Sequence, residues 1–358
     1  MRPGPLNSIL DVAGLTVGHA VDHRLASGVS VVIPDRPAVA SVHVMGGAPG
    51  TRDTELLSPE ETIERIDAIV LAGGSAYGLG APSGVMAYMT EQGRGFRVGD
   101  VRVPIVPAAI LFDLMNGGDK DWGRFPPYRN LGWTAAEDAN REPFDCGSTG
   151  VGFGATTATL MGGLGTASIV LPSGHIVAAM VAVNAVGSAT VGDGPHFWAA
   201  PFEIDGEFGG LGLPHPWPED AATPRLKGAV PTSGAATTLA IVATDATLTK
   251  AQAKRLAVQA HDGFARALWP AHTPLDGDLV FTMATGDKPL DDPLADMVAL
   301  GIAAVSVTAR AIARGVHGAS SKNWSKVPSW AERWAPEADA DAASASAEPG
   351  VTPPPEPA

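Results

Sequence analysis

Short apolar runs alternate with helical patterns along most of this chain. Residues 69–72 have the composition of a buried strand, and an apolar helix is predicted over about 77–90. Further strands are predicted at 164–171, 176–183, 238–244 and 279–283, and further helices at 249–268 and 293–314. Because strands and helices mix along the whole sequence without an internal repeat, the pattern predicts an α/β fold.

Local capping and turn signals set some of the element boundaries. Thr249 and Gln252 have the spacing of a capping box at the start of the predicted helix 249–268. The sequence Ser-Pro-Glu-Glu at 58–61 predicts another helix start, with serine as N-cap and proline at the first helical position. Pro-Ser-Gly at 172–174 predicts the turn between two neighbouring strands.

The end of the chain has a different composition from the rest. Residues 336–358 contain no aromatic residue and consist mostly of Ala, Asp, Glu, Ser and Pro, so they cannot bury enough apolar area to offset chain entropy. We predict one domain over 1–335 and a disordered tail over 336–358. Inside the domain, 194–236 is rich in Gly and Pro and has little periodicity, which is typical of a functional or mobile loop.

Charge and composition exclude several classes of partner. The chain carries 24 Lys and Arg against 38 Asp and Glu, a formal net charge of −14. An acidic protein without a basic stripe binds nucleic acid poorly, and no apolar run reaches the roughly 18 residues of a membrane span. We therefore expect neither a nucleic-acid nor a membrane partner. The start of the chain lacks a signal-peptide pattern and Cys146 is the single cysteine, so we expect a cytoplasmic protein.

Several motif-like segments have a structural alternative. The Gly-rich stretch 147–154 lacks the Gly-Lys-Ser/Thr ending of a phosphate loop, and the nine histidines show no metal-ligand spacing, so we expect neither a metal nor another cofactor. Asp276 and Asp278 flank a glycine just before an apolar strand; taken alone, Asp-Gly favours a tight turn. Asn184 ends an apolar strand, where a buried amide is either structurally satisfied or a donor aimed into a site.

Seven stretches, in this order, together resemble one family. They are MGGAPGTRDTELLSP (45–59), IVLAGGSAYGL (69–79), VPIVPAAILFD (103–113), GGLGTAS (162–168), VAVNAVG (181–187), ATTLAIVATDATL (236–248) and AHDGFARALWPAHTPLDGDLVF (260–281). They are similar to the P1 family of peptidases, the L-aminopeptidase/D-esterase group with β-peptidyl aminopeptidases and the nylon-oligomer hydrolase as relatives. The resemblance covers residues 5–330, nearly everything but the tail.

The resemblance implies an N-terminal-nucleophile hydrolase with an αββα four-layer sandwich, in which helices cover two stacked sheets. Members of this family cut themselves into two chains that stay together, and the first residue of the second chain is the nucleophile. That position matches Thr237, so the Ala236–Thr237 bond is the expected scissile bond, giving chains 1–236 and 237–358. The family's supporting asparagine matches Asn184, and its paired aspartates match Asp276 and Asp278.

The implied chemistry agrees with elementary acid–base reasoning. A threonine hydroxyl needs a base, and a free α-amine with a pKa of about 7.7–8.0 suits that role near neutral pH. We expect Thr237 Oγ1 to attack the Ala236 carbonyl, water to hydrolyse the resulting ester, and the freed threonine then to form an acyl-enzyme with substrate. Asp276 and Asp278 are expected to orient the hydroxyl and favour the protonated amine, and Asn184 to donate to the hydroxyl or the oxyanion.

Three positions depart from the family pattern. Ala236 stands where asparagine or glycine often precedes the nucleophile. A family lysine is missing near 159–161, where this chain has Thr-Leu-Met. The oxyanion-stabilising tyrosine of some members matches Phe112, which has no hydroxyl; the backbone amides of Gly73 and Gly74 are the candidates to replace it in the oxyanion hole.

The resemblance implies an aminopeptidase or an amidase/esterase that acts on a small peptide, amide or ester. It also implies a homo-oligomer, since the family tends to tetramers. Two alternatives stay open at this point: an acyltransferase of the ornithine acetyltransferase kind, and a weakly active or unprocessed homologue with a binding role.

Overall fold

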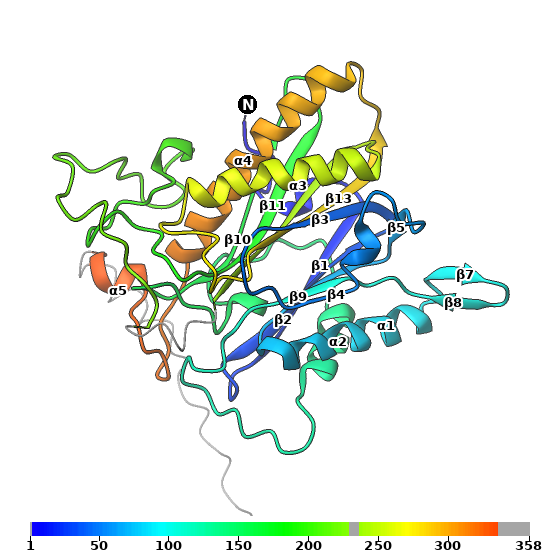
Figure 1. Ribbon diagram of the computed structural model, residues 1–358, viewed down its shortest axis with the longest axis horizontal. Coiled ribbons are helices and arrows are strands. Elements are labelled where there is room, and N and C mark those ends of the chain that lie inside the picture. Colours follow the sequence, from blue (N-terminus) through cyan, green and yellow to red (C-terminus); the bar gives the residue numbers. More distant parts are fainter. Residues whose placement is uncertain (1, 229–235, 336–358) are drawn as a thin grey trace, which may run out of the picture.

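Two stacked β-sheets lie between two pairs of helices in the computed structural model, which describes residues 2–228 and 236–335 (Figure 1). The first sheet contains, in spatial order, β1 (Leu15–Asp22), β2 (Ser27–Pro34), β6 (Ile69–Ala72), β9 (Ala108–Ile110) and β4 (Thr51–Arg52). The second contains β10 (Gly163–Val170), β11 (Ile176–Asn184), β12 (Thr237–Ala246), β13 (Leu279–Lys288), β3 (Ala38–Val44) and β5 (Arg65–Ile66).

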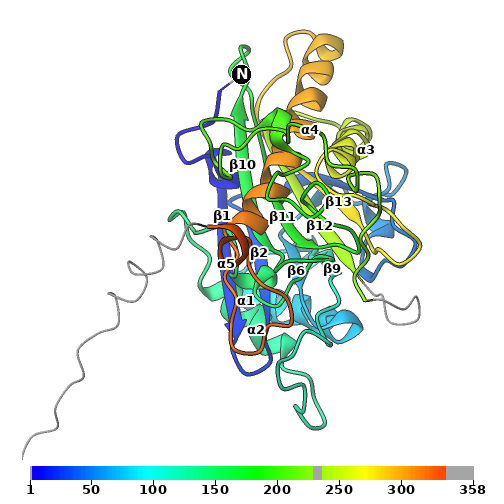
Figure 2. The ribbon, with the colours of Figure 1, turned by 90° about the vertical axis from the view of Figure 1, so that its left-hand side faces the viewer.

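The two helix pairs cover the outer faces of the sheets. Helices α3 (Lys250–Ala265) and α4 (Pro293–His317) cover the second sheet, whereas α1 (Ala81–Glu91) and α2 (Tyr128–Glu137) cover the first (Figure 1 and Figure 2). These four layers agree with the αββα sandwich that the resemblance implies. A small hairpin of β7 (Phe96–Val98) and β8 (Val101–Val103) projects beside α1, and α5 (Trp330–Trp334) ends the described chain.

Alternate side chains of each central strand enter different apolar layers. In β12, Leu239 lies between the two sheets, whereas Ala240 faces the α3–α4 layer. In β6, Leu71 lies between the sheets and Val70 faces α1 and α2. Burial of each Val or Leu side chain stabilises the fold by about 1.5–3 kcal/mol. Because both faces of these strands are buried, they are continuous apolar runs in the sequence.

The high glycine content allows α4 to approach the sheet closely. A Cβ atom on Gly165 of β10 would collide with the carbonyl oxygen of Ala311 in α4. By length and composition α4 could cross a membrane, yet it packs as a core helix between α3, β10 and β11.

Most predicted elements are confirmed with shifts of a few residues at their ends. The capping box of Thr249 and Gln252 is present at the start of α3. The predicted helix start at 58–61 is wrong: the segment forms a turn in which Glu61 N donates to Ser58 O at 3.0 Å. The chain then runs through β-branched Thr62 and Ile63 into β5, and such residues favour extended backbone.

Helix α1 begins later than predicted, because residues 75–80 form a 3₁₀ turn before it. The predicted disordered tail, 336–358, lies outside the described residues, as do residues 229–235 of the predicted loop.

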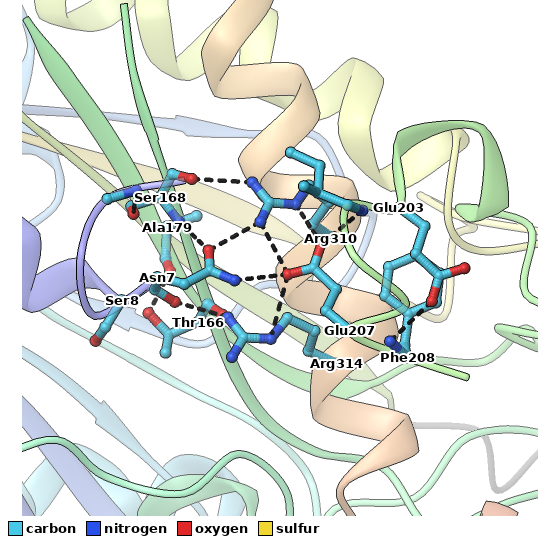
Figure 3. Close-up of polar contacts among 12 residues, drawn as sticks. Asn7, Ser8, Thr166, Ser168, Ala179, Glu203, Glu207, Phe208, Arg310 and Arg314 are labelled. Carbon is cyan, nitrogen blue, oxygen red and sulfur yellow. Dashed lines mark hydrogen bonds and ion pairs between the residues drawn. The ribbon is translucent and has the colours of Figure 1, made fainter. Parts of the chain in front are cut away.

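The loop that follows β11 is anchored to α4 by a buried ion-pair network (Figure 3). Arg310 is fully buried and donates through Nε and, at 2.8 Å, through Nη2 to the carboxylate of Glu207. Arg310 Nη2 also donates to Asn7 Oδ1 at 2.8 Å, and Arg314 donates to the Asn7 carbonyl oxygen at 2.6 Å. Because removing one partner of a buried pair costs about 3–5 kcal/mol, the network holds this loop and the N-terminal segment firmly on α4.

Candidate active site

The four residues expected to form the site meet at one end of the inner strands β11, β12 and β13 of the second sheet. Thr237 begins β12 and is paired with Asn184 at the end of β11. Because β13 runs parallel to β12, the turn before β13, which carries Asp276 and Asp278, reaches the same edge. All four residues are buried, and each exposes at most 3% of its surface.

The Ala236–Thr237 peptide has an unusual set of contacts. Thr237 Oγ1 donates to the carbonyl oxygen of Ala236 at 2.6 Å, and the backbone N–H of Gly277 donates to the same oxygen at 2.8 Å. Ala236 N donates in turn to Leu275 O at 3.2 Å, so a short parallel bridge holds the peptide against the 275–277 turn. The candidate nucleophile therefore lies directly on the carbonyl group that self-cleavage would attack.

Asp276 anchors its own turn from inside. Its Oδ1 accepts from Val186 N at 3.0 Å, and its Oδ2 accepts from Thr273 N at 3.0 Å and Thr273 Oγ1 at 2.7 Å. Burial, followed by the charge of Asp278, raises the pKa of Asp276. These contacts hold the turn to the end of β11 and do not involve the Thr237 hydroxyl.

Asp278 links the same turn to β12 and to a row of histidines. Its Oδ1 accepts from Thr238 N at 2.7 Å, and its Oδ2 accepts from the backbone and ring nitrogens of His272 at 3.0 and 2.9 Å. His272 has a left-handed φ of 56°, which is uncommon for a residue with a side chain. Its Nε2 lies 3.3 Å from Nδ1 of His261, whose pKa burial lowers to about 3. His261 is thus a neutral hydrogen-bonding partner.

Asn184 is oriented by three neighbours. Its Oδ1 accepts from Thr156 N at 3.1 Å and from Lys227 Nζ at 2.8 Å, and its Nδ2 donates to Phe112 O at 2.9 Å. An amide nitrogen carries two hydrogens, so Asn184 retains a second donor for a bound group.

Lys227 is a site residue that the sequence did not reveal. Burial lowers the pKa of its amine to about 7, against the opposing charges of Asp276 and Asp113. It comes from the aperiodic loop after β11, where it is the only lysine, but no motif or spacing in that loop points to a site. Near the position of the missing family lysine, Leu160 and Met161 are buried and apolar, while Lys227 places an amine on Asn184 from another segment.

Gly73 and Gly74 have no free amide for an oxyanion in this structure. Gly73 N donates to Gly28 O at 2.9 Å, and Gly74 N donates to Asp113 Oδ1 at 2.8 Å. Each N–H therefore already has a partner within the first sheet and its neighbouring loop. Phe112 contributes its carbonyl oxygen to Asn184 and lines the neighbouring cavity.

A cavity of about 260 Å³ opens beside Asn184's partners. It is lined by Phe112, Asp113, Met115, Asn116, Thr156, Thr157, Ala158, Lys227, Gly228, Lys326 and Val327. Its mixture of apolar and hydrogen-bonding groups suits a small organic substrate. Within 2–228 and 236–335, no group of three or more His, Cys, Asp or Glu side chains could hold a metal ion.

Comparison with known sequences gives the family. The model of peptidase family S58 matches residues 7–326. An uncharacterized aminopeptidase of Mycobacterium tuberculosis is 40% identical over 331 residues, which cover 87% of this chain and 94% of the relative. A 6-aminohexanoate-oligomer endohydrolase of Paenarthrobacter ureafaciens is 27% identical over 310 residues, which cover 84% of this chain and 80% of the relative.

Comparison with solved structures gives the fold. A Burkholderia β-aminopeptidase superposes with a TM-score of 0.69 at 23% identity, covering 94% of this chain and 96% of the other. The L-aminopeptidase D-Ala-esterase/amidase of Ochrobactrum anthropi, described as a variant of the Ntn hydrolase fold, superposes with a TM-score of 0.68 at 21% identity, covering 92% of each chain. The fold is thus of the Ntn hydrolase type, and the family resemblance drawn from the sequence is confirmed. The chain belongs to peptidase family S58 and is a hydrolase of the aminopeptidase/amidase kind.

Proposed function

We propose that this chain cleaves itself between Ala236 and Thr237 and that the freed Thr237 is the nucleophile for amide or ester hydrolysis. The observation that carries the proposal is the 2.6 Å hydrogen bond from Thr237 Oγ1 to the Ala236 carbonyl oxygen, at the buried start of a strand. A hydroxyl held on its own preceding carbonyl needs little movement to attack it.

Self-cleavage needs a base other than the threonine nitrogen, because that nitrogen is still an amide in the uncut chain. Lys227 supports this role: its amine contacts Asn184, the strand partner of Thr237, and its lowered pKa of about 7 provides a neutral amine near neutral pH. Lys227 would accept the hydroxyl proton as Thr237 Oγ1 attacks, and return it to the leaving nitrogen.

The mature enzyme would use the new α-amine of Thr237 as its base. The amine takes the hydroxyl proton while Oγ1 attacks the substrate carbonyl, and it then protonates the leaving group. Water hydrolyses the acyl-enzyme and restores the hydroxyl. The second hydrogen of Asn184 Nδ2, on the strand partner of Thr237, would stabilise the charge that develops on the carbonyl under attack.

The cavity and the relatives support a proposal for the substrate class. A cavity of about 260 Å³ beside Lys227 and Asn184's other partners suits a small peptide, amide or ester. The similar proteins are named as an uncharacterized aminopeptidase and a 6-aminohexanoate-oligomer endohydrolase, and both names denote hydrolysis of amide bonds. We therefore propose hydrolysis of small amides, with N-terminal aminoacyl amides as the first compounds to assay.

The test compares the wild-type chain with Thr237→Ser and Thr237→Ala on a panel of aminoacyl p-nitroanilides. The serine variant keeps a hydroxyl and should retain processing and turnover, whereas the alanine variant should have neither. Turnover by Thr237→Ala would show that another residue is the nucleophile. Product that forms only with an added amine acceptor would favour acyl transfer over hydrolysis.

A further inference from the structure

We propose that the backbone N–H of Gly277 is the oxyanion donor of this site, held in place by Asp276 and Asp278. The inference rests on the self-cleavage proposed above. The N–H lies 2.8 Å from Ala236 O, the atom that gains negative charge when Thr237 attacks. This distance falls within the range of about 2.7–3.1 Å expected for an oxyanion donor.

The site leaves no space for a side chain at position 277. A Cβ atom there would lie 2.5 Å from Thr237 Oγ1 and 2.7 Å from the carbonyl oxygen of Ala48. The φ angle of Gly277 is outside the left-handed region, so the backbone conformation alone does not demand glycine. What demands glycine is the closeness of the turn to the nucleophile, and that closeness is also what lets the N–H reach the scissile carbonyl.

The flanking aspartates fix this N–H from both sides. Asp276 accepts from Val186 N and from Thr273, which ties the turn to the end of β11. Asp278 accepts from Thr238 N, the residue after the nucleophile, which ties the turn to the start of β12. The two carboxylates therefore act as positioning residues: they set the distance between the donor and the hydroxyl without touching the hydroxyl.

Thr237, Lys227 and the Gly277 N–H together account for each bond and proton in the self-cleavage step. The bond from Thr237 Oγ1 to the Ala236 carbonyl carbon forms, and the carbonyl electron pair moves onto Ala236 O, where the Gly277 N–H stabilises it. The hydroxyl proton moves through Lys227 to the Thr237 nitrogen as the C–N bond breaks, leaving an ester. Water then hydrolyses the ester, which leaves the Ala236 carboxylate on the first chain and Thr237, with a free hydroxyl and α-amine, at the start of the second. A substrate carbonyl oxygen would next occupy the place of Ala236 O, against the same N–H.

The experiment replaces the Gly277 N–H by a group that cannot donate a hydrogen bond. Glycolate incorporated in place of Gly277 exchanges the N–H for an ester oxygen and adds no side chain. The matched control is glycolate in place of Gly174, whose N–H donates to Leu171 O at 2.9 Å in the turn between β10 and β11. Both chains lose one turn hydrogen bond, but Gly277 is buried and Gly174 is half-buried. The melting temperature of each chain is therefore measured, and both are assayed well below it.

The readout is the first-order loss of the intact chain, followed by mass spectrometry. We expect the Gly277 ester to cleave at Ala236 about 10²–10³-fold more slowly than the Gly174 ester, which should match the wild type. Fragment masses separate this cleavage from hydrolysis of the introduced ester. Equal rates for the two esters would overturn this inference while leaving self-cleavage standing. A wild-type chain that never cleaves would refute the proposed function itself.

Discussion

The Gly73–Gly74 turn after β6 and the Asp276–Asp278 turn before β13 both place glycine beside a buried carboxylate at the end of the stacked sheets. In the first turn, the N–H of Gly74 donates to Asp113, which follows β9, and is therefore already occupied. In the second, Asp276 and Asp278 accept N–H groups from Val186, Thr273, Thr238 and His272, and the Gly277 N–H is left for Ala236 O.

The difference shows what makes a glycine turn chemically useful. A glycine allows close approach, but its N–H is available only when neighbouring acceptors are occupied by other donors. Asp113 is a structural acceptor whose own pKa burial raises, whereas Asp276 and Asp278 orient a donor toward the reacting carbonyl. Substitutions at matched residues of the two turns test this difference.

The largest effect is expected at Lys227. The carboxylates of Asp276 and Asp113, one beside each turn, both raise the pKa of its amine against the effect of burial. As pH rises through about 7 the amine loses its proton and becomes a base, so wild-type self-cleavage should accelerate and then level off. Lys227→Met should slow cleavage by about 10²–10⁴-fold and remove that rise. A Lys227→Met chain with an unchanged rate–pH profile would show that the base lies elsewhere.

The next effect separates the two glycine turns by substitution with alanine. In Gly277→Ala the new Cβ displaces the nucleophile, and a misplacement of about 1 Å costs about 10²-fold in rate. In Gly73→Ala the new Cβ instead collides with Asp113 and Ser27, so overpacking should lower stability by about 1–3 kcal/mol while self-cleavage persists.

Gly80→Ala is the control for that pair, because a Cβ there meets only Arg129 N at an ordinary 3.8 Å. It should change stability by less than about 0.5 kcal/mol. Thermal unfolding and cleavage time courses measure all three chains. If Gly73→Ala blocked cleavage as fully as Gly277→Ala at equal stability, the contrast between the turns would fail.

The smallest effect compares the carboxylates. Asp278→Asn replaces one carboxylate oxygen with an NH₂ group, so one of the buried N–H groups of Thr238 or His272 loses its acceptor. This costs about 1–3 kcal/mol of stability. If about 1.4 kcal/mol of that cost is added to the activation barrier, cleavage slows about tenfold. Asp113→Asn should slow cleavage less, because its carboxylate accepts from Ser27 Oγ and Gly74 N rather than from the turn that holds the Ala236 carbonyl. Cleavage rates at fixed pH decide the matter, and equal slowing in both variants would contradict the separate roles.

Strands with strong local patterns were predictable from the sequence. The apolar runs of β6, β10, β11, β12 and β13, and the capping box of α3, define their elements without tertiary information. The helix predicted from residue 58 failed because a capping signal requires a helix-favouring segment after it, and this segment continues instead into a short strand.

The candidate site was predictable only in part. Thr237, Asn184, Asp276 and Asp278 came from family motifs, and the fold brings them together because antiparallel β11 and parallel β13 both flank β12. The role of Lys227 could not be predicted, because it lies in a loop without a periodic pattern or a motif. The Gly277 N–H could not be found either, because a backbone donor leaves no trace in side-chain patterns and its availability depends on which acceptors surround it.

The most direct test of the account is the intact mass of purified protein followed over time, with sequencing of any new N-terminus. We expect the 36.5 kDa chain to be replaced by chains of 236 and 122 residues, the second beginning at Thr237, and Thr237→Ala to stay whole. A wild-type chain that remains at 36.5 kDa, or a new N-terminus at any other residue, would contradict it.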